Sequence, residues 1–199
     1  NGSGKTKVIL CQGNHETYTH GVSQAPAVFK EQTGQDANKV IDVNGTTVIT
    51  LGPSGASDHS YTSSYDFLCS ALKGLADPSA PIVLLSHHQI HNTSYTSTEW
   101  YGDYGEGTGS DIVALMKRYP NIIHVSGHSH ATLEDERSIN QDFGFTEIQD
   151  STIGAYYENE TGKIDPDTGE GTSVPPQTSP AYTDGKNIAE AAQCIILDI

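Results

Sequence analysis

Short apolar runs alternate with helical patterns along the first two thirds of the chain. Three of these runs are mainly apolar and rich in β-branched residues, which favours strands buried on both faces; they are 7–11, 82–86 and 122–126. Residues 40–51 form two further strand patterns joined by Asn44-Gly45, a dipeptide that suits the positive φ angles of a type I′ hairpin turn. The apolar pattern therefore predicts a sheet that contains at least one hairpin.

Two helical patterns lie between these strands. Residues 63–75 and 110–119 each place apolar side chains on one face, with Ser63 and Ser110 as the expected N-caps and Pro120 after the second helix. The order strand–helix–strand–helix–strand predicts an α/β fold with parallel strands.

The composition sets further limits. A chain of 199 residues corresponds to a single domain, 1–199, and its Gly-, Pro- and acid-rich stretch at about 159–187 is expected to be an insertion without regular structure. The 25 acidic and 10 basic residues give a net charge of -15, which argues against duplex nucleic acid as a partner. No apolar run approaches the ~20 residues that a membrane span needs. The acidity leans slightly towards a secreted or cell-surface location, and the compartment stays open.

Polar clusters directly follow three of the predicted strands. They are residues 13–16, 86–89 and 127–130, and they contain five of the nine histidines. In open α/β sheets, ligands bind outside the carboxyl ends of the strands, so these side chains are expected to converge. Converging neutral imidazoles suit a divalent metal ion such as Zn, Mn or Fe.

The three clusters carry a resemblance to a known family. Gly13-Asn14-His15-Glu16, His87 after an apolar strand, and Gly127-His128-Ser129-His130, in this order and spacing, resemble motifs of the calcineurin-like metallophosphoesterases. The resemblance implies part of a two-sheet sandwich with flanking helices and a dinuclear metal centre between the sheets. It also implies hydrolysis of phosphomonoesters or phosphodiesters by a metal-bound hydroxide, with a small phosphorylated substrate.

The resemblance assigns four metal ligands. Asn14, His87 and His128 would bind the second metal, and His130 would bind the first.

It also assigns two catalytic positions. His15 would lie near the departing oxygen and donate a proton or a hydrogen bond, and Glu16 would orient His15. The role of the neighbouring His88 is left open.

The chain departs from the family pattern at its beginning. The family starts with an Asp-x-His motif and a Gly-Asp segment, and this sequence has neither. Because the four matching ligands are all neutral, two divalent cations would lack carboxylates to offset their charge. We therefore expect at most one ion here, where a complete domain holds two. We also expect the sheet to lack its N-terminal strands, a missing N-terminal segment of the same protein to be the partner that completes the site, and hydrolysis by these 199 residues to be absent or very slow.

Two other interpretations stay open. One is a degenerate, non-catalytic domain of the same ancestry, and the other is an extracellular binding module, which the acidic, Tyr- and Thr-rich composition favours. The loop 92–109 adds two sets of candidates. Its aromatic residues could contact a base or a sugar; they include Tyr95, Trp100, Tyr101 and Tyr104. The carboxylates in and beside it fit a solvated acidic loop better than a metal site; they are Asp103, Glu106 and Asp111.

Overall fold

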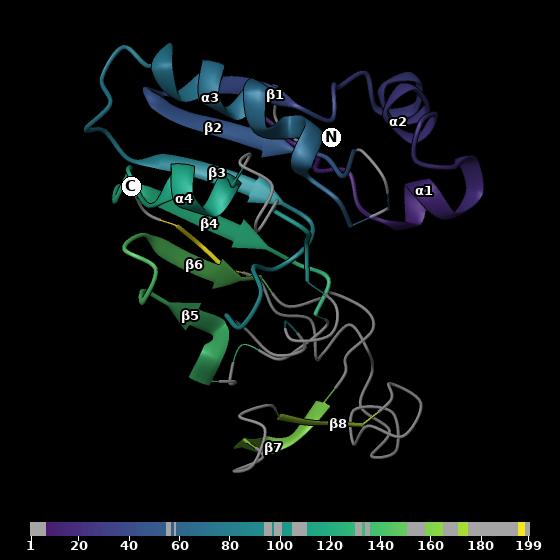
Figure 1. The fold of residues 1–199 in the computed structure, drawn as a ribbon, viewed down its shortest axis with the longest axis vertical. Coiled ribbons are helices and arrows are strands. Elements are labelled where there is room, and N and C mark those ends of the chain that lie inside the picture. Colours follow the sequence, from purple (N-terminus) through teal and green to yellow (C-terminus); the bar gives the residue numbers. More distant parts are fainter. Residues whose placement is uncertain are drawn as a thin grey trace.

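A six-stranded mixed sheet is the centre of the fold, and the α/β class is confirmed at that level (Figure 1). The computed structural model describes residues 7–54, 57, 59–93, 97, 101–104, 111–129, 133, 136–150, 158–164, 171–174 and 195–197. The strand order is β1-β2-β3-β4-β6-β5. The strands are β1 (Lys39–Val43), β2 (Thr46–Leu51), β3 (Ile82–Ser86), β4 (Ile122–Ser126), β5 (Ile139–Asn140) and β6 (Thr146–Gln149). The helices are α1 (His15–His20), α2 (Ala25–Thr33), α3 (Tyr65–Lys73) and α4 (Ile112–Met116), with short 3-10 turns at Thr62–Ser64 and Glu136–Ser138.

The predicted hairpin is confirmed. Strands β1 and β2 pair antiparallel with Val43 opposite Thr46, and Asn44 and Gly45 both have positive φ angles, 54° and 93°. Two central residues at positive φ define the type I′ geometry, whose twist matches that of the strands it joins.

Four neighbouring strands, β2, β3, β4 and β6, run parallel. The predicted strands at 82–86 and 122–126 coincide with β3 and β4. Along β4 the fully buried residues alternate with half-buried ones, which places Ile122, His124 and Ser126 towards the core. Because all four strands point the same way, their carboxyl ends meet at one edge of the sheet.

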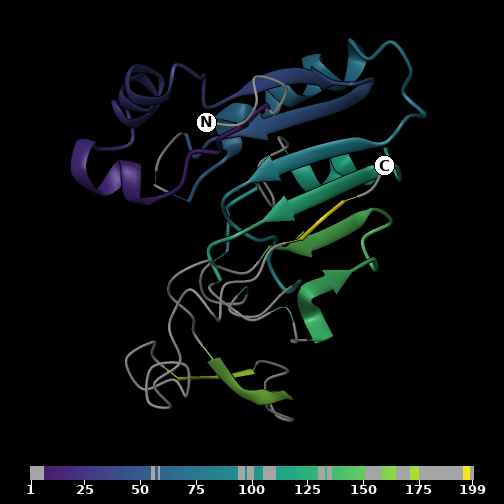
Figure 2. The same cartoon turned by 180° about the vertical axis from the view of Figure 1, so that it is seen from behind.

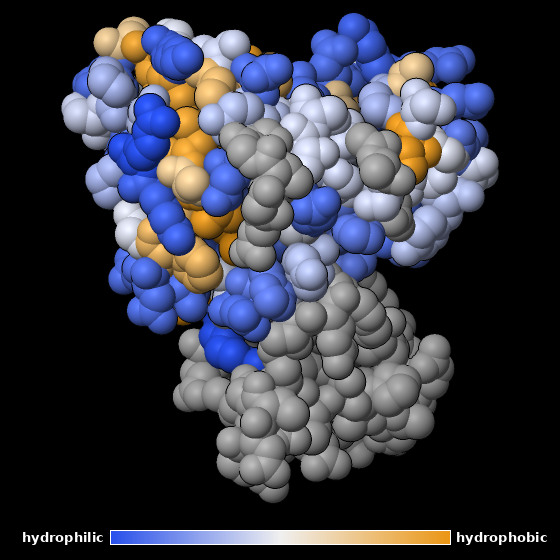
Figure 3. Space-filling view, viewed as in Figure 1, coloured by the Kyte–Doolittle hydropathy of each residue, from blue (hydrophilic) through white to orange (hydrophobic). Residues whose placement is uncertain are grey.

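Helices α3 and α4 cover the same face of the sheet, as the front and back views show (Figures 1 and 2). Leu68 and Leu72 of α3 and Ile112 and Met116 of α4 are buried in the core beneath them. Apolar surface remains visible in the region of these helices (Figure 3), where several side chains that pack on the core are only partly buried.

The helices differ from the prediction at their starts. A 3-10 turn precedes α3, and its N-cap is Ser64 rather than Ser63. Helix α4 is capped by Asp111, whose side chain accepts from the Ala114 N–H at 2.9 Å, whereas Ser110 lies outside the described residues. Aspartate and serine are both strong N-cap residues, so the sequence pattern alone could not decide between Ser110 and Asp111 as the cap of this helix.

The predicted strand at 7–11 is wrong. Residues 7–11 form no strand, and Val8 and Leu10 are 64% and 39% exposed. The segment instead bonds to side chains and loops: the Leu10 N–H donates to Gln35 Oε1, and Lys39 Nζ donates to the Leu10 carbonyl. Both edges of strand β2 are already paired, one with β1 and the other with β3, so residues 7–11 cannot join the sheet beside β2.

The prediction that the stretch 159–187 has no regular structure is also wrong in part. It overlaps a second, two-stranded antiparallel sheet formed by β7 (Glu158–Ile164) and β8 (Gly171–Val174). The prediction rested on the average composition of the stretch, whereas a local hairpin needs only two short segments that satisfy each other's backbone groups. Among the described residues, no helix has the length and apolar character needed to cross a bilayer.

Candidate metal centre

The carboxyl edge of the parallel strands carries the histidine cluster. Strands β3 and β4 end at Ser86 and Ser126, and His87 and His128 follow within two residues. The Gly127 N–H donates to the His87 carbonyl at 3.0 Å, which joins the two strand ends beyond the regular pairing. The fold therefore brings together two histidines that are far apart in sequence, as the strand-end argument predicted.

Asn14 reaches the same cluster from α1. It occupies the N-cap position of that helix, but its side chain makes no capping bond. Its Oδ1 lies 2.9 Å from His87 Nε2, and its Nδ2 donates to the Tyr18 hydroxyl at 2.7 Å. A Cβ added at Gly13 would lie 3.2 Å from the His87 ring, so the residue before Asn14 has to be small for this approach.

His128 completes a set of three closely spaced donor atoms. Its Nδ1 lies 3.1 Å from His87 Nε2, and its φ angle is +66°, an uncommon conformation for a residue other than glycine. Ligand atoms about 2.1 Å from a shared cation are themselves about 3.0–3.4 Å apart, depending on whether the geometry is octahedral or tetrahedral. The two pairs are hydrogen-bonded here, and hydrogen bonds have the same lengths, so the donor types favour one divalent ion held by Asn14, His87 and His128 and the distances allow it.

His88 belongs to the same cluster, although the sequence left its role open. One ring nitrogen from each of His87, His88 and His128 lies within 4.8 Å of the others. Burial, and then the neighbouring imidazoles of His128, His87 and His59, lower the pKa of His88 to about 2. The ring is therefore neutral at physiological pH, as a metal ligand must be.

The other predicted site residues are placed differently. His15 is exposed on α1, with its ring 5.1 Å from that of Tyr18. The Glu16 carboxylate accepts from the Gly13 N–H at 2.8 Å, so it braces the turn that carries Asn14. His130 lies outside the described residues.

Asp150 adds a carboxylate at the same edge, directly after β6. Its Oδ1 would lie 3.1 Å from a Cβ on Gly127, and its N–H donates to the Ser126 carbonyl. Desolvation raises the pKa of this carboxyl to about 6, although the residue as a whole is exposed.

This raised pKa predicts a pH dependence of stability. A carboxyl whose pKa is higher in the folded than in the unfolded state stabilises the fold below its unfolded pKa, and that contribution is lost as the pH rises through about 6. Asp150→Asn should therefore reduce the fall in melting temperature between about pH 4 and pH 6, and should stabilise the fold slightly at pH 7.5. We expect less than about 1 kcal/mol, because an exposed carboxylate keeps much of its hydration. Thermal unfolding across this pH range measures the change in melting temperature. The same dependence of melting temperature on pH in wild type and variant would contradict the raised pKa of Asp150.

A cavity of about 360 Å³ lies beside the cluster. His59 is part of its lining, and its ring centroid is 6.4 Å from that of His88. Tyr101, one of the predicted substrate-contacting aromatics, also lines the cavity and packs against His91 with ring centroids 4.3 Å apart. Tyr104 is buried in its wall.

The remaining loop candidates have other placements. Asp103 lines the cavity, and Asp111 caps α4 rather than joining the histidine cluster. Tyr95, Trp100 and Glu106 lie outside the described residues.

Comparison with known proteins adds no relative: no family model matches the chain, and no curated protein sequence matches it. The resemblance to metallophosphoesterases therefore rests on the motifs themselves.

Proposed function

We propose that this chain carries a divalent-cation site of a phosphoester hydrolase. The convergence of Asn14 Oδ1, His87 Nε2 and His128 Nδ1 carries the proposal, because two donors of kinds that bind divalent cations lie 2.9 Å and 3.1 Å from the His87 atom between them. The same three residues stand at the positions where the sequence resembles the calcineurin-like motifs. The resemblance also implies a second sheet facing the six-stranded one.

Different residues of the chain bind the cation and donate the proton. Asn14, His87 and His128 hold the cation, and β3, β4 and the start of α1 fix their positions. A bound divalent cation supplies positive charge at the phosphoryl oxygens and lowers the pKa of water. His15, exposed on α1 next to Asn14, donates a proton or a hydrogen bond to the departing oxygen.

The cavity next to His88 supports an organic phosphoester as substrate. Its lining combines the apolar Ile90 and Val113 with the rings of Tyr101 and His91, a mixture that suits a flat organic group. The phosphate would then lie at the histidine cluster, with the remainder of the substrate in the cavity.

Hydrolysis of bis(p-nitrophenyl) phosphate and p-nitrophenyl phosphate, with Mn²⁺ or Zn²⁺ added, tests the proposal. We expect slow, cation-dependent release of p-nitrophenol that Asn14→Ala removes. Turnover that Asn14→Ala leaves unchanged would contradict the proposal. Tight cation binding without any hydrolysis would favour the non-catalytic domain, which the neutral ligand set already makes a specific alternative.

A further inference from the structure

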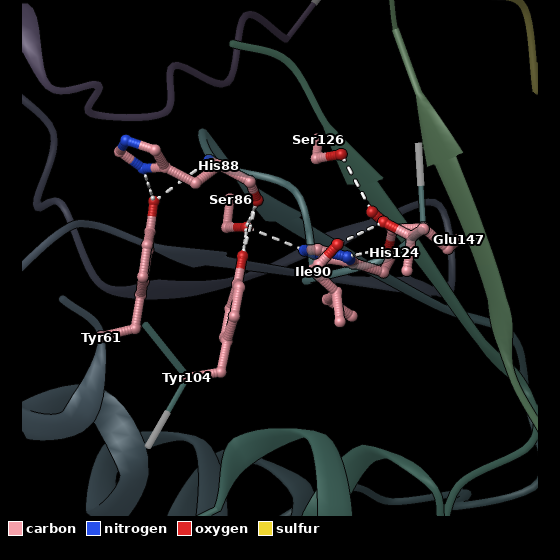
Figure 4. Close-up of polar contacts among 9 residues, drawn as sticks. Tyr61, Ser86, His88, Ile90, Tyr104, His124, Ser126 and Glu147 are labelled. Carbon is pink, nitrogen blue, oxygen red and sulfur yellow. Dashed lines mark hydrogen bonds and ion pairs between the residues drawn. The ribbon is translucent and has the colours of Figure 1, made fainter. Parts of the chain in front are cut away.

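A chain of buried polar groups runs beneath the histidine cluster (Figure 4). It begins at Glu147 of β6, which is 1% exposed and bonds to His124 Nδ1 through one oxygen and to the Ser126 hydroxyl through the other. His124 Nε2 lies 2.8 Å from Ser86 Oγ. This series of polar contacts thus crosses three neighbouring strands, from Glu147 of β6 through His124 of β4 to Ser86, the last residue of β3.

Two stacked tyrosines continue the chain towards His88. The rings of Tyr61 and Tyr104 are parallel within 8°, with centroids 4.9 Å apart, and both side chains are buried. The Tyr104 hydroxyl lies 2.5 Å from Ser86 Oγ and donates to the His88 carbonyl at 2.6 Å. The Tyr61 hydroxyl lies 2.9 Å from His88 Nδ1 and accepts from the His88 N–H at 3.3 Å.

The carboxylate end determines one hydrogen of this group. A carboxylate accepts, so His124 Nδ1 carries a hydrogen, and Ser86 Oγ lies 2.8 Å from the other ring nitrogen. The Ser86 hydroxyl also lies 3.1 Å from the His88 carbonyl and 2.5 Å from the Tyr104 hydroxyl, so it links the buried His124–Glu147 pair to the His88 turn. At the His88 ring, the Tyr61 oxygen lies where it can accept from Nδ1–H.

Because Nδ1 faces the Tyr61 hydroxyl, Nε2 is the ring nitrogen of His88 that is placed to bind a metal ion. Figure 4 shows that nitrogen on the side of the ring away from Tyr61. The ring centroid of His88 is 4.3 Å from that of His128 and 5.0 Å from that of His87. An acceptor lone pair among two other imidazoles is the arrangement that a metal ion requires.

We propose that His88 is a third imidazole ligand of the cation through its Nε2, with its Nδ1–H donating to the Tyr61 hydroxyl oxygen. Three imidazoles favour a borderline divalent metal such as Zn²⁺ over Mg²⁺ or Ca²⁺, which prefer oxygen ligands. The inference rests on the proposed cation site, and it does not depend on hydrolysis.

Long-range ¹H–¹⁵N NMR of the ¹⁵N-labelled, zinc-free chain tests the tautomer directly, with His88 identified by its missing signals in His88→Asn. We expect Nδ1 to be protonated and Nε2 to be bare, and we expect the Nε2 resonance to shift when Zn²⁺ is added. A hydrogen on Nε2, or an Nε2 resonance that saturating Zn²⁺ leaves in place, would overturn the proposal. This measurement on the wild-type chain decides the question even if a tyrosine variant fails to fold.

Two matched variants test the role of Tyr61. Tyr61→Phe removes the hydroxyl that faces the His88 ring, and should lower the affinity for Zn²⁺ about 10–100-fold, as loss of an outer partner of a ligand does. Tyr104→Phe removes a hydroxyl from the neighbouring stacked ring. Among the described residues this hydroxyl bonds to the His88 carbonyl and Ser86 and not to the His88 ring, so the variant should leave the His88 tautomer unchanged. Equal effects of the two variants on Zn²⁺ affinity would contradict the tautomer role. Zn²⁺ binding through His88 without phosphoester hydrolysis would remove the proposed hydrolase but leave this ligand assignment in place.

Discussion

His87→Ala is expected to abolish cation binding by the chain and any hydrolysis that depends on it. His87 Nε2 is the donor atom that contacts both of the others, since it lies 2.9 Å from Asn14 Oδ1 and 3.1 Å from His128 Nδ1. Removing it takes away the donor that lies between Asn14 and His128, and leaves two imidazoles, His88 and His128, where the wild type has three. The loss in Zn²⁺ or Mn²⁺ affinity should exceed the roughly 10–100-fold that removal of an outer partner costs.

Isothermal titration with each metal measures this loss. His20→Ala is the matched control, because His20 is the last residue of α1 and is not among the histidines that cluster in the described part of the chain. We expect one equivalent of metal per chain in wild type and in His20→Ala, and none in His87→Ala. Unchanged binding in His87→Ala would contradict the site, and two tightly held equivalents in wild type would contradict the argument that a neutral ligand set holds one ion.

The strand-end rule explains why the sequence could predict this cluster. Parallel strands end at one edge of a sheet, so polar residues directly after two apolar runs had to approach each other, as His87 and His128 do. Asn14 was predicted for a partly wrong reason, because residues 7–13 before it form no strand. It reaches the cluster from the N-cap of α1, with Glu16 bracing the turn through the Gly13 N–H.

The buried support of the cluster could not be predicted in this way. Tyr61 approaches His88 from a loop whose path depends on how α3 packs, and Glu147 belongs to a four-residue strand with too few positions to show an alternating pattern. The register between β4 and β6 then sets His124 opposite Glu147. Sequence fixes such a pairing only through the packing of the whole sheet, and one shift in register would separate the two side chains.

Removing one member of the buried His124–Glu147 pair should produce a large loss of stability. Both side chains are essentially inaccessible, at 0% and 1% exposure, and they are directly hydrogen-bonded. Glu147→Ala leaves His124 Nδ1 and the Ser126 hydroxyl without their acceptor in the core. Loss of one partner of a buried pair of this kind costs about 3–5 kcal/mol, a large part of the 5–15 kcal/mol that typically stabilises a domain. Urea unfolding followed by circular dichroism measures the change.

The double variant His124→Leu/Glu147→Leu distinguishes pairing from simple loss of packing. Replacing both partners by apolar side chains removes the buried hydrogen-bonding groups together, so the double variant should be less destabilised than the sum of the two single leucine variants. Additive losses would show that the two residues contribute independently. Because Ser86 bonds to His124 and also to Tyr104, a double variant that folds should still disturb the His88 turn. We therefore expect it to recover stability while its affinity for Zn²⁺ stays below that of the wild type, which would separate what the pair does for the fold from what it does for the metal centre.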